Sequence, residues 1–375
     1  MVFNVVSFVI FILALSGMII VHELGHFFAA RWAGVEVEEF GLGLPSKKLV
    51  TLFTWQGTEF TIHALPLGGF VRPKGENDPN VPGGLASANP WKRLVVLFAG
   101  PLMNLITAVI VFSLLIMFEG VPVPGSVKID SVGDNSPAFD AGLQRGDVLL
   151  AINGESVTEI QPAIDLIQAN LDQSVELLVD RNGEQITLTA MPLSTRSREE
   201  GSLGVALTYP TRPATFTEIT TGGVTITALQ AAGIVYLPIA LIQGAIDPSE
   251  ARFVGFKGIF DMFNVAVQED VTSRQEATVP AAGASTPSTA SSRPSYWTLN
   301  LIGLLSISLG VMNLFPIPAL DGGRILFTLP EIIFRKRIPA DWENTVNGIA
   351  MLLLISLLLF VNVMDFINPA QIPTP

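Results

Sequence analysis

The sequence predicts a polytopic α-helical membrane protein with four transmembrane helices, an inserted α+β domain and a membrane-proximal β-hairpin. Two observations carry this fold class. Of the 375 residues, 49% are hydrophobic and only 14% are charged, whereas soluble proteins are about 25% charged. Four segments also reach the roughly 20 apolar residues that a helix needs to cross a bilayer. A net charge of −12 argues against a nucleic-acid partner, and the absence of cysteine excludes disulfides and thiolate metal sites.

The four predicted spans are Val2–Val21, Leu94–Phe118, Trp297–Phe315 and Val346–Met364. The N-terminus lacks a basic region, and no small-residue cleavage site follows the first apolar run. We therefore expect the first span to remain as an anchor and not to be removed as a signal peptide.

The positions of lysine and arginine predict how the spans are oriented, because short basic loops stay in the cytoplasm. Basic residues flank the loop between the first two spans and crowd the loop after the third. Both loops should be cytoplasmic, which places the long central region on the other side. The basic residues that decide this are Arg31, Lys92, Arg93, Arg324, Arg335, Lys336 and Arg337.

A fifth candidate span, Gly222–Ile246, is uncharged but diluted by threonine, glutamine and glycine, and Pro238 should interrupt its helix. A full crossing here would also put the basic flank of the next helix on the wrong side of the membrane. We therefore expect this segment to be amphipathic or interfacial.

The first span ends in His22-Glu23-Leu24-Gly25-His26. Histidines at i and i+4 lie on one face of a helix and can share a zinc ion, and Glu23 can take a proton from a water molecule. Ionisable groups in a membrane span normally face a protein interior or a watery cavity and carry function. The alternative is a chance match in which the histidines only pack.

The loop after this motif should contain a β-hairpin, because Leu49–Trp55 and Glu59–Leu65 alternate on either side of Gln56-Gly57. An exposed strand edge just beyond the histidines could hold a peptide in extended form. The composition alone slightly favours the alternative, an ordinary cytoplasmic hairpin.

The central region from Gly125 to about Val205 predicts a compact α+β domain. Strands are expected at Val148–Ile152, Ser174–Val179 and Glu184–Ala190, with a helix at about Pro162–Asn170. Together with the run from Ala141 to Asp147 (AGLQRGD), this pattern resembles a PDZ domain. Such domains bind a peptide end by strand addition; binding of a terminus and simple shielding of the site both remain open.

Residues Ala277–Ser295 consist almost entirely of alanine, serine, threonine and proline, which predicts a flexible linker. The expected organisation is as follows: 1–30 first transmembrane helix; 31–93 cytoplasmic loop with hairpin; 94–118 second transmembrane helix; 122–207 PDZ domain; 208–268 amphipathic region; 269–296 linker; 297–323 third transmembrane helix; 324–344 cytoplasmic loop; 345–366 fourth transmembrane helix.

A catalytic zinc site needs a third protein ligand. The candidates are His63, the remaining histidine of the chain, and Asp321, which follows a proline-broken helix end. By the predicted topology, Asp321 and His26 both approach the cytoplasmic ends of their helices. We therefore favour Asp321 and expect His63 to be a strand residue of the hairpin.

Taken together, the HExxH motif, Ala99-Gly100-Pro101-Leu102-Met103-Asn104, the PDZ-like domain and the run Asn313–Gly323 (NLFPIPALDGG) resemble the bacterial PDZ-containing site-2 proteases. This resemblance covers most of the chain. It implies one zinc ion held by His22, His26 and Asp321, with Glu23 as general base. It also implies that Asn313 positions the substrate and that the hairpin presents it. Family members often have two PDZ units, whereas only one is found here.

The expected activity is therefore peptide-bond hydrolysis within the transmembrane segments of single-span membrane proteins, such as anti-sigma factors or remnant signal peptides. The protein should lie in the inner or plasma membrane, in contact with lipid, with its PDZ domain on the non-cytoplasmic side. A membrane scaffold and a transporter are the alternatives. The intact Glu23 with a full ligand set argues against the first, and the lack of inverted repeats argues against the second.

Overall fold

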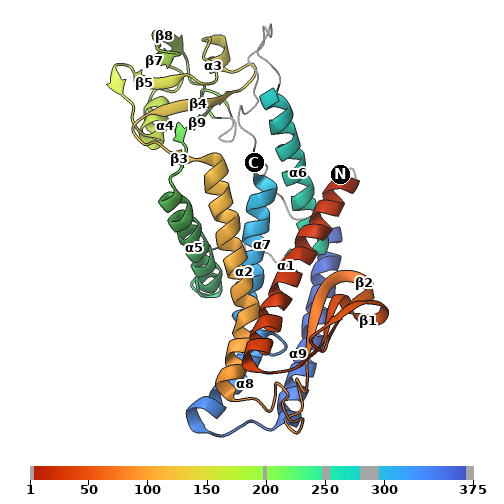
Figure 1. The fold of residues 1–375 in the computed structure, drawn as a ribbon. Helices are drawn as coiled ribbons and strands as arrows, with labels where there is room; N and C mark the ends of the chain where they lie inside the picture. Colours follow the sequence, from red (N-terminus) through yellow and green to blue (C-terminus); the bar gives the residue numbers. More distant parts are fainter. Residues whose placement is uncertain (1–3, 197–200, 247–253, 279–294, 369–375) are drawn as a thin grey trace. The chain divides into compact units, whose positions relative to one another are not determined.

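The computed structural model describes residues 4–196, 201–246, 254–278 and 295–368. The chain forms two compact units: one comprises residues 1–114, 220–268 and 297–375, and the other comprises residues 115–219 and 269–296 (Figure 1). The first unit contains most of the long helices and one β-sheet. The second contains the α+β domain predicted for the central region.

Helices α1 (Val5–Ala33) and α2 (Pro90–Glu119) start and stop at capping residues. The side chain of Asn4 accepts hydrogen bonds from the backbone of the first turn of α1, and Gly34 ends that helix in the left-handed conformation, with φ of 77°. Pro90 opens α2, where its missing N–H costs nothing. Both helices exceed the length needed to cross a bilayer.

Helix α2 lies between α1 and α7 (Trp297–Leu314) in the first unit. Small residues allow both contacts: Gly25 of α1 lies against the Ala99 carbonyl, while Gly310 of α7 lies against the Pro101 carbonyl. Because a side chain at either glycine would meet backbone atoms, these helices approach closely only through glycine. The hydroxyl of Ser306 adds a hydrogen bond of 2.8 Å to the Asn104 carbonyl.

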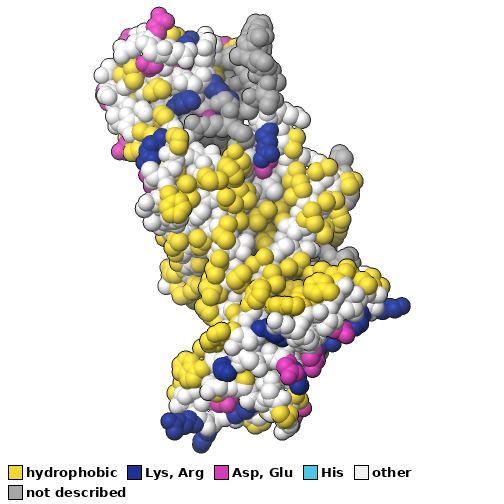
Figure 2. Space-filling model, in the orientation of Figure 1, with side chains coloured by type: hydrophobic (Ala, Val, Ile, Leu, Met, Phe, Trp, Pro, Cys, Tyr) yellow, Lys and Arg dark blue, Asp and Glu magenta, His cyan; other side chains and the backbone are white. Residues whose placement is uncertain are grey.

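Five helices of the described residues are long and apolar enough to cross a membrane, so the predicted count of four is not confirmed. The additional one is α5 (Phe216–Ile242), and the fourth predicted span corresponds to α9 (Ala340–Ile367). Figure 2 shows hydrophobic side chains over much of the visible helical surface, as expected for surfaces that face lipid. Their exposed members include Ile110, Val235 and Leu353.

The expectation that Pro238 interrupts α5 was wrong, because the helix continues through it. Polar residues are also accommodated within α5. Thr227, for example, donates its hydroxyl to the Gly223 carbonyl at 2.8 Å, one turn earlier, which satisfies the side chain without water. Gly223 itself lies against Ser113 and the Val109 carbonyl of α2. Helix α5 is therefore better suited to an apolar environment than its composition suggests.

Three predicted boundaries need correction. Helix α6 (Phe256–Thr278) takes up the first part of the predicted linker, and the rest of the linker, residues 279–294, lies outside the described residues. The third span ends at Leu314, and Asp321 opens a separate helix, α8 (Asp321–Phe334), where a span end and a loop were predicted. Two prolines, Pro316 and Pro318, separate α7 from α8 and explain the break.

The predicted hairpin is present but longer, with β1 (Val37–Trp55) and β2 (Thr58–Pro73) joined at Gln56-Gly57. Both turn residues have positive φ, 48° and 85°, as a tight two-residue hairpin turn requires. The strands bend, so that Phe40 pairs with Phe60 on one side and with Val71 on the other. Four extended segments thus lie side by side, in the order 69–73, 37–42, 59–63 and 48–55. Segment 69–73 is an edge of this sheet.

The sheet is attached to α1 by an apolar cluster. Phe27, near the end of α1, is 1% exposed and packs edge-on against Phe40 and Phe60 of the sheet. This cluster places edge segment 69–73 beside the histidine motif of α1. The other buried members of the cluster are Ala30, Ala33, Val35, Val37, Leu85 and Val96.

The second unit is built on a sheet of strand order β8-β7-β5-β4-β9, with β6 beside β5. Its core contains alternating side chains of the strands and the inner face of α4. Strand β9 is the last strand on its side of the sheet, and no further strand of the described residues pairs with its outer edge. The elements are β4 (Val127–Val132), α3 (Pro137–Asp140), β5 (Val148–Ile152), β6 (Glu155–Ser156), α4 (Ile160–Ala169), β7 (Val175–Arg181), β8 (Glu184–Ala190) and β9 (Val205–Thr208).

A short pairing closes the base of this domain. Strand β3 (Val121–Pro122), directly after α2, pairs with β10 (Thr211–Arg212), directly before α5. Beside it, the rings of Phe118 and Tyr296 stack with centroids 5.2 Å apart. The end of α2, the beginning of α5 and Tyr296 therefore lie together in this unit.

Candidate metal centre

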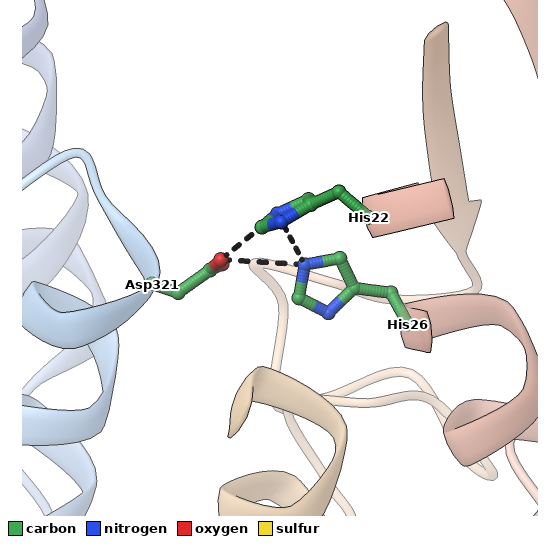
Figure 3. A group of neighbouring side chains, drawn as sticks. All are labelled: His22, His26 and Asp321. Carbon is green, nitrogen blue, oxygen red and sulfur yellow. Dashed lines mark hydrogen bonds and ion pairs between the residues drawn. The ribbon is translucent and has the colours of Figure 1, made fainter. Parts of the chain in front are cut away.

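Three side chains from two distant parts of the sequence converge beside the C-terminal half of α1 (Figure 3). Oδ2 of Asp321 lies 3.2 Å from Nε2 of His22 and 3.3 Å from Nε2 of His26, and the two Nε2 atoms are 3.1 Å apart. In the described part of the chain, this is the group of histidine and acidic side chains close enough to hold one metal ion. His63, the alternative third ligand, is not part of it.

This donor set fits a tetrahedral zinc ion. Zinc–nitrogen and zinc–oxygen bonds are about 2.0–2.1 Å long, so two ligands of a tetrahedron lie about 3.3–3.4 Å apart. The three measured separations of 3.1–3.3 Å are close to that value. Two imidazoles and one carboxylate also leave the fourth position open for water or substrate, as in catalytic zinc sites.

Helix α2 orients the imidazole of His26. The Nδ1 atom of His26 donates to the Val96 carbonyl at 2.8 Å, which leaves Nε2 unprotonated and free for a metal. Pro101 cannot donate a backbone hydrogen bond within this stretch of α2. Gly100 lies directly against the His26 ring, where any side chain would overlap it. Gly100 thus provides the space for the His26 ring, and the Val96 carbonyl provides its acceptor.

The second histidine is also held by α2. The side-chain amide of Asn104 lies 3.2 Å from Nδ1 of His22 and is fully buried. The sequence predicted no role for Asn104 or for the Val96 carbonyl. The i, i+4 spacing identifies the two histidines, but the partners of their outer nitrogens depend on how α1 packs on α2.

Glu23 is tied to the edge of the sheet. Its Oε2 atom accepts a hydrogen bond of 3.0 Å from the Val71 backbone N–H, in edge segment 69–73. A Cβ atom at Gly69, in the same segment, would lie 3.8 Å from Cγ of Glu23. The sheet edge and the histidine motif are therefore immediate neighbours.

A cavity of about 220 Å³ opens onto these groups. His22, Glu23, His26 and Asp321 line it together with Asn313, whose amide donates to the Leu309 carbonyl at 3.0 Å. All predicted site residues thus border one space. Edge residues Phe70, Val71 and Pro73 form another part of its wall.

A partly buried arginine borders the same cavity. Arg324, one turn after Asp321, forms an ion pair with Glu76 and donates to Oδ1 of Asn77 at 2.9 Å. Burial opposes its charge, but the carboxylate of Glu76 raises the pKa of Arg324 above its ordinary value. The pair joins α8 to the loop that follows the sheet, next to the metal centre.

His63 belongs to a buried polar network within the sheet. Its Nε2 atom lies 3.0 Å from Oε1 of Glu39, which also accepts from the Thr61 hydroxyl at 2.7 Å, while Arg72 pairs with Oε2 at 2.9 Å. Burial alone would raise the pKa of Glu39, but these hydrogen bonds and the Arg72 charge hold it below its ordinary value. The network links the central segments to edge segment 69–73.

The second unit carries a separate groove of about 210 Å³ between α4 and β9. Its walls include Ile160, Ile164 and Ile167 of α4 and Val205 and Leu207 of β9, together with residues 201–204. An apolar groove beside a free strand edge has the form of a site for an extended peptide.

Comparison with known proteins gives consistent matches. The family model described as Peptidase family M50 matches residues 10–357. A protein of Clostridium perfringens named "Putative zinc metalloprotease" is 32% identical over 366 residues, which cover 96% of this chain and 98% of the relative. One of Campylobacter jejuni with the same description is 31% identical over 379 residues, covering 97% and 94%.

Among solved structures, the PDZ domain of an SdrC-like protein from Listeria monocytogenes matches 23% of this chain and 90% of its own length. The sequence identity is 24% and the TM-score is 0.20.

Proposed function

The chain belongs to peptidase family M50 and is a membrane zinc metalloprotease, and we propose that it hydrolyses peptide bonds within transmembrane segments of other membrane proteins. One observation carries this proposal. The proposed ligand triad of His22, His26 and Asp321 lies beside the C-terminal half of an apolar 29-residue helix and opens onto a cavity with Glu23. A hydrolytic centre so placed is suited to a peptide bond at membrane depth.

The residues of the site divide the chemistry between them. A zinc ion held by the triad supplies Lewis acidity, which makes water nucleophilic near neutral pH and polarises the scissile carbonyl. Glu23 accepts the proton of the attacking water and passes it to the leaving amine. One oxygen of Glu23 is held by the Val71 N–H, so the carboxylate keeps a defined direction toward the cavity.

Edge segment 69–73 supports a role in presenting the substrate. A peptide in a transmembrane helix has its carbonyls and amides engaged with one another, so it must unwind before attack. Pairing with backbone groups of this edge other than the Val71 N–H, which Glu23 already engages, would compensate those lost hydrogen bonds. Asn313, on another wall of the cavity, supplies an amide to position the unwound chain.

The groove of the second unit supports peptide binding by a PDZ domain. The free edge of β9 can take up an extended peptide end, and three isoleucines of α4 can receive its apolar side chains. We propose that this domain selects single-span substrates, of the kind represented by anti-sigma factors and remnant signal peptides, on the non-cytoplasmic side.

The position of the cleaved bond tests the proposal. Purified protein in lipid nanodiscs is incubated with a single-span substrate that carries tags at both ends, and the products are mapped by mass spectrometry. We expect cuts within the span, inhibition by a zinc chelator, and no cleavage by Glu23→Gln with wild-type zinc content. Cuts confined to the loops outside the span, or undiminished cleavage by the zinc-loaded variant, would contradict it.

A further inference from the structure

We propose that Asn104 is a positioning residue for the metal centre: its side-chain carbonyl accepts the Nδ1 proton of His22 and so directs Nε2 of that ring to zinc. The inference rests on the proposed ligand set and extends it to α2. It assigns a role to the last residue of the Ala99–Asn104 motif, which the proposed chemistry does not otherwise use.

Metal binding through Nε2 of His22 determines which nitrogen of that ring carries the proton. A neutral imidazole carries one N–H, and a ring that binds a metal through one nitrogen normally donates from the other. Nε2 of His22 faces Asp321 and His26, so the proton must be on Nδ1 when zinc is bound. The partner recorded for Nδ1 is the Asn104 amide, at 3.2 Å.

The Asn104 side-chain amide has a donor, Nδ2, at one end and an acceptor, Oδ1, at the other. In this structure Nδ2 faces His22, whereas Oδ1 is buried without a hydrogen-bond partner among the described residues. When Nδ2 of Asn104 donates, Nδ1 of His22 accepts, and Nε2 of His22 carries the ring proton. Nε2 can then donate a hydrogen bond to Asp321. A half-turn about the Cβ–Cγ bond brings the unused Oδ1 to Nδ1, which suits a bound metal.

Asn104 can therefore serve both protonation patterns of His22, because an amide offers a donor and an acceptor at opposite ends. Its complete burial makes an unsatisfied partner costly in either pattern. The Val96 carbonyl serves His26 in the equivalent way. Both outer nitrogens of the ligand pair are thus held by α2, two turns apart on the same helix.

The variants that test this role differ in their acceptor. Asn104→Leu keeps the approximate shape but offers no acceptor, whereas Asn104→Asp keeps an acceptor. Ser306→Ala is the matched control, because Ser306 is also fully buried and bonds to Asn104, but only to its backbone carbonyl. Zinc affinity of the full chain is measured by competition with a chromophoric chelator, together with the visible spectrum of the cobalt-substituted protein.

We expect Asn104→Leu to bind zinc about 10- to 100-fold more weakly and to show an altered cobalt spectrum. Asn104→Asp and Ser306→Ala should keep near wild-type affinity. Wild-type affinity in Asn104→Leu would overturn the inference, as would a loss in Asn104→Asp or in Ser306→Ala as large as in Asn104→Leu. Asp321→Ala is measured in parallel, because retention of zinc in that variant would instead refute the ligand set.

Discussion

At the scale of single residues, the centre depends on where each proton lies. The Nε2 atoms of His22 and His26 point toward one position because the Nδ1 atoms of both rings face α2. Asp321 joins them because α8 begins at that residue, which places its carboxylate at the start of a helix and opposite the two rings. Three elements must therefore pack correctly before a metal can bind.

The ligand assignment predicts different zinc contents for substitutions at Asp321 and His63. Asp321→Ala should lower zinc occupancy as well as activity, because it removes one of three ligands. His63→Ala should leave zinc content near normal, because His63 bonds to Glu39 inside the sheet. Metal analysis of the two purified variants decides; a zinc-free His63→Ala protein of normal fold would show the third ligand to be misassigned.

The sequence predicted the proposed ligands of the site, but not the residues that hydrogen-bond to the site side chains. The i, i+4 spacing named His22 and His26, and the expected topology favoured Asp321 over His63. Asn104 and the Val96 carbonyl were not foreseen in these roles, because they act across an interface between helices about 80 residues apart. Val71 was missed for the same reason, since its N–H meets Glu23 only once the sheet packs on α1.

At the scale of elements, the close contact of α1 with α2 sets the geometry of the centre. Gly25, between the two histidines, faces the Ala99 carbonyl without room for a Cβ atom. A larger residue must therefore push the helices apart, or shift the turn that carries both ligands. Gly17, two turns earlier on α1, has nothing within 4 Å of its missing Cβ and provides a control on the same helix.

This contact predicts that Gly25→Ala lowers the free energy of unfolding by about 1–3 kcal/mol and weakens zinc binding. Gly17→Ala should be neutral or stabilising by up to about 1 kcal/mol, because alanine favours helix over glycine. Denaturant unfolding in detergent and zinc titration measure both effects. Equal stability and zinc affinity in the two variants would argue against close packing at Gly25.

The elements were predicted best where their pattern is local. The turn at Gln56-Gly57, the strands Val148–Ile152 and Glu184–Ala190 and the first two spans follow from alternation, turn residues and apolar length. The apolar character of α5 was underestimated, because a threonine such as Thr227 bonds to its own helix, which composition does not reveal. The extent of α8 was missed because its length is set by packing beyond the two prolines.

At the scale of the whole molecule, the second unit is a separable insertion. Its base is closed by the pairing of β3 with β10 and by a hydrogen bond of 2.7 Å from Val123 N–H to the Pro210 carbonyl. All proposed ligands, the general base and Asn313 belong to the first unit. The chemistry should therefore not require the inserted domain.

Deleting residues 125–208 and joining the remaining ends at the β3–β10 base should change which substrates are cut without abolishing cleavage. We expect the shortened protein to bind zinc normally and to cleave single-span proteins with long ectodomains that the full chain leaves intact. Cleavage assays with a short and a long ectodomain on the same span distinguish these outcomes. A folded, zinc-loaded deletion without any activity would make the domain part of the catalytic machinery.

The last whole-molecule prediction concerns the path of the chain around α5. Because β3 pairs with β10 and Phe118 stacks on Tyr296, the end of α2, the start of α5 and the residue directly before α7 lie together, and we expect them on one side of the membrane. The chain from α5 to the end of α6 must therefore return to the side on which it began, however deeply α5 enters the membrane. On the predicted topology, this return directs α7 toward the cytoplasm, so that Asp321 can reach the depth of His22 and His26.

Single cysteines at Ser202 and Ser285 test this path, and the absence of native cysteine makes their labelling unambiguous. Ser202 lies in the inserted domain before α5, and Ser285 lies outside the described residues, between α6 and α7. We expect both to react with a membrane-impermeant thiol reagent from the same, non-cytoplasmic face, while a cysteine at Lys336, in the basic loop after α8, reacts only after permeabilisation. Labelling of Ser202 and Ser285 from opposite faces would require an odd number of crossings between them, and α7 would then carry Asp321 away from the two histidines.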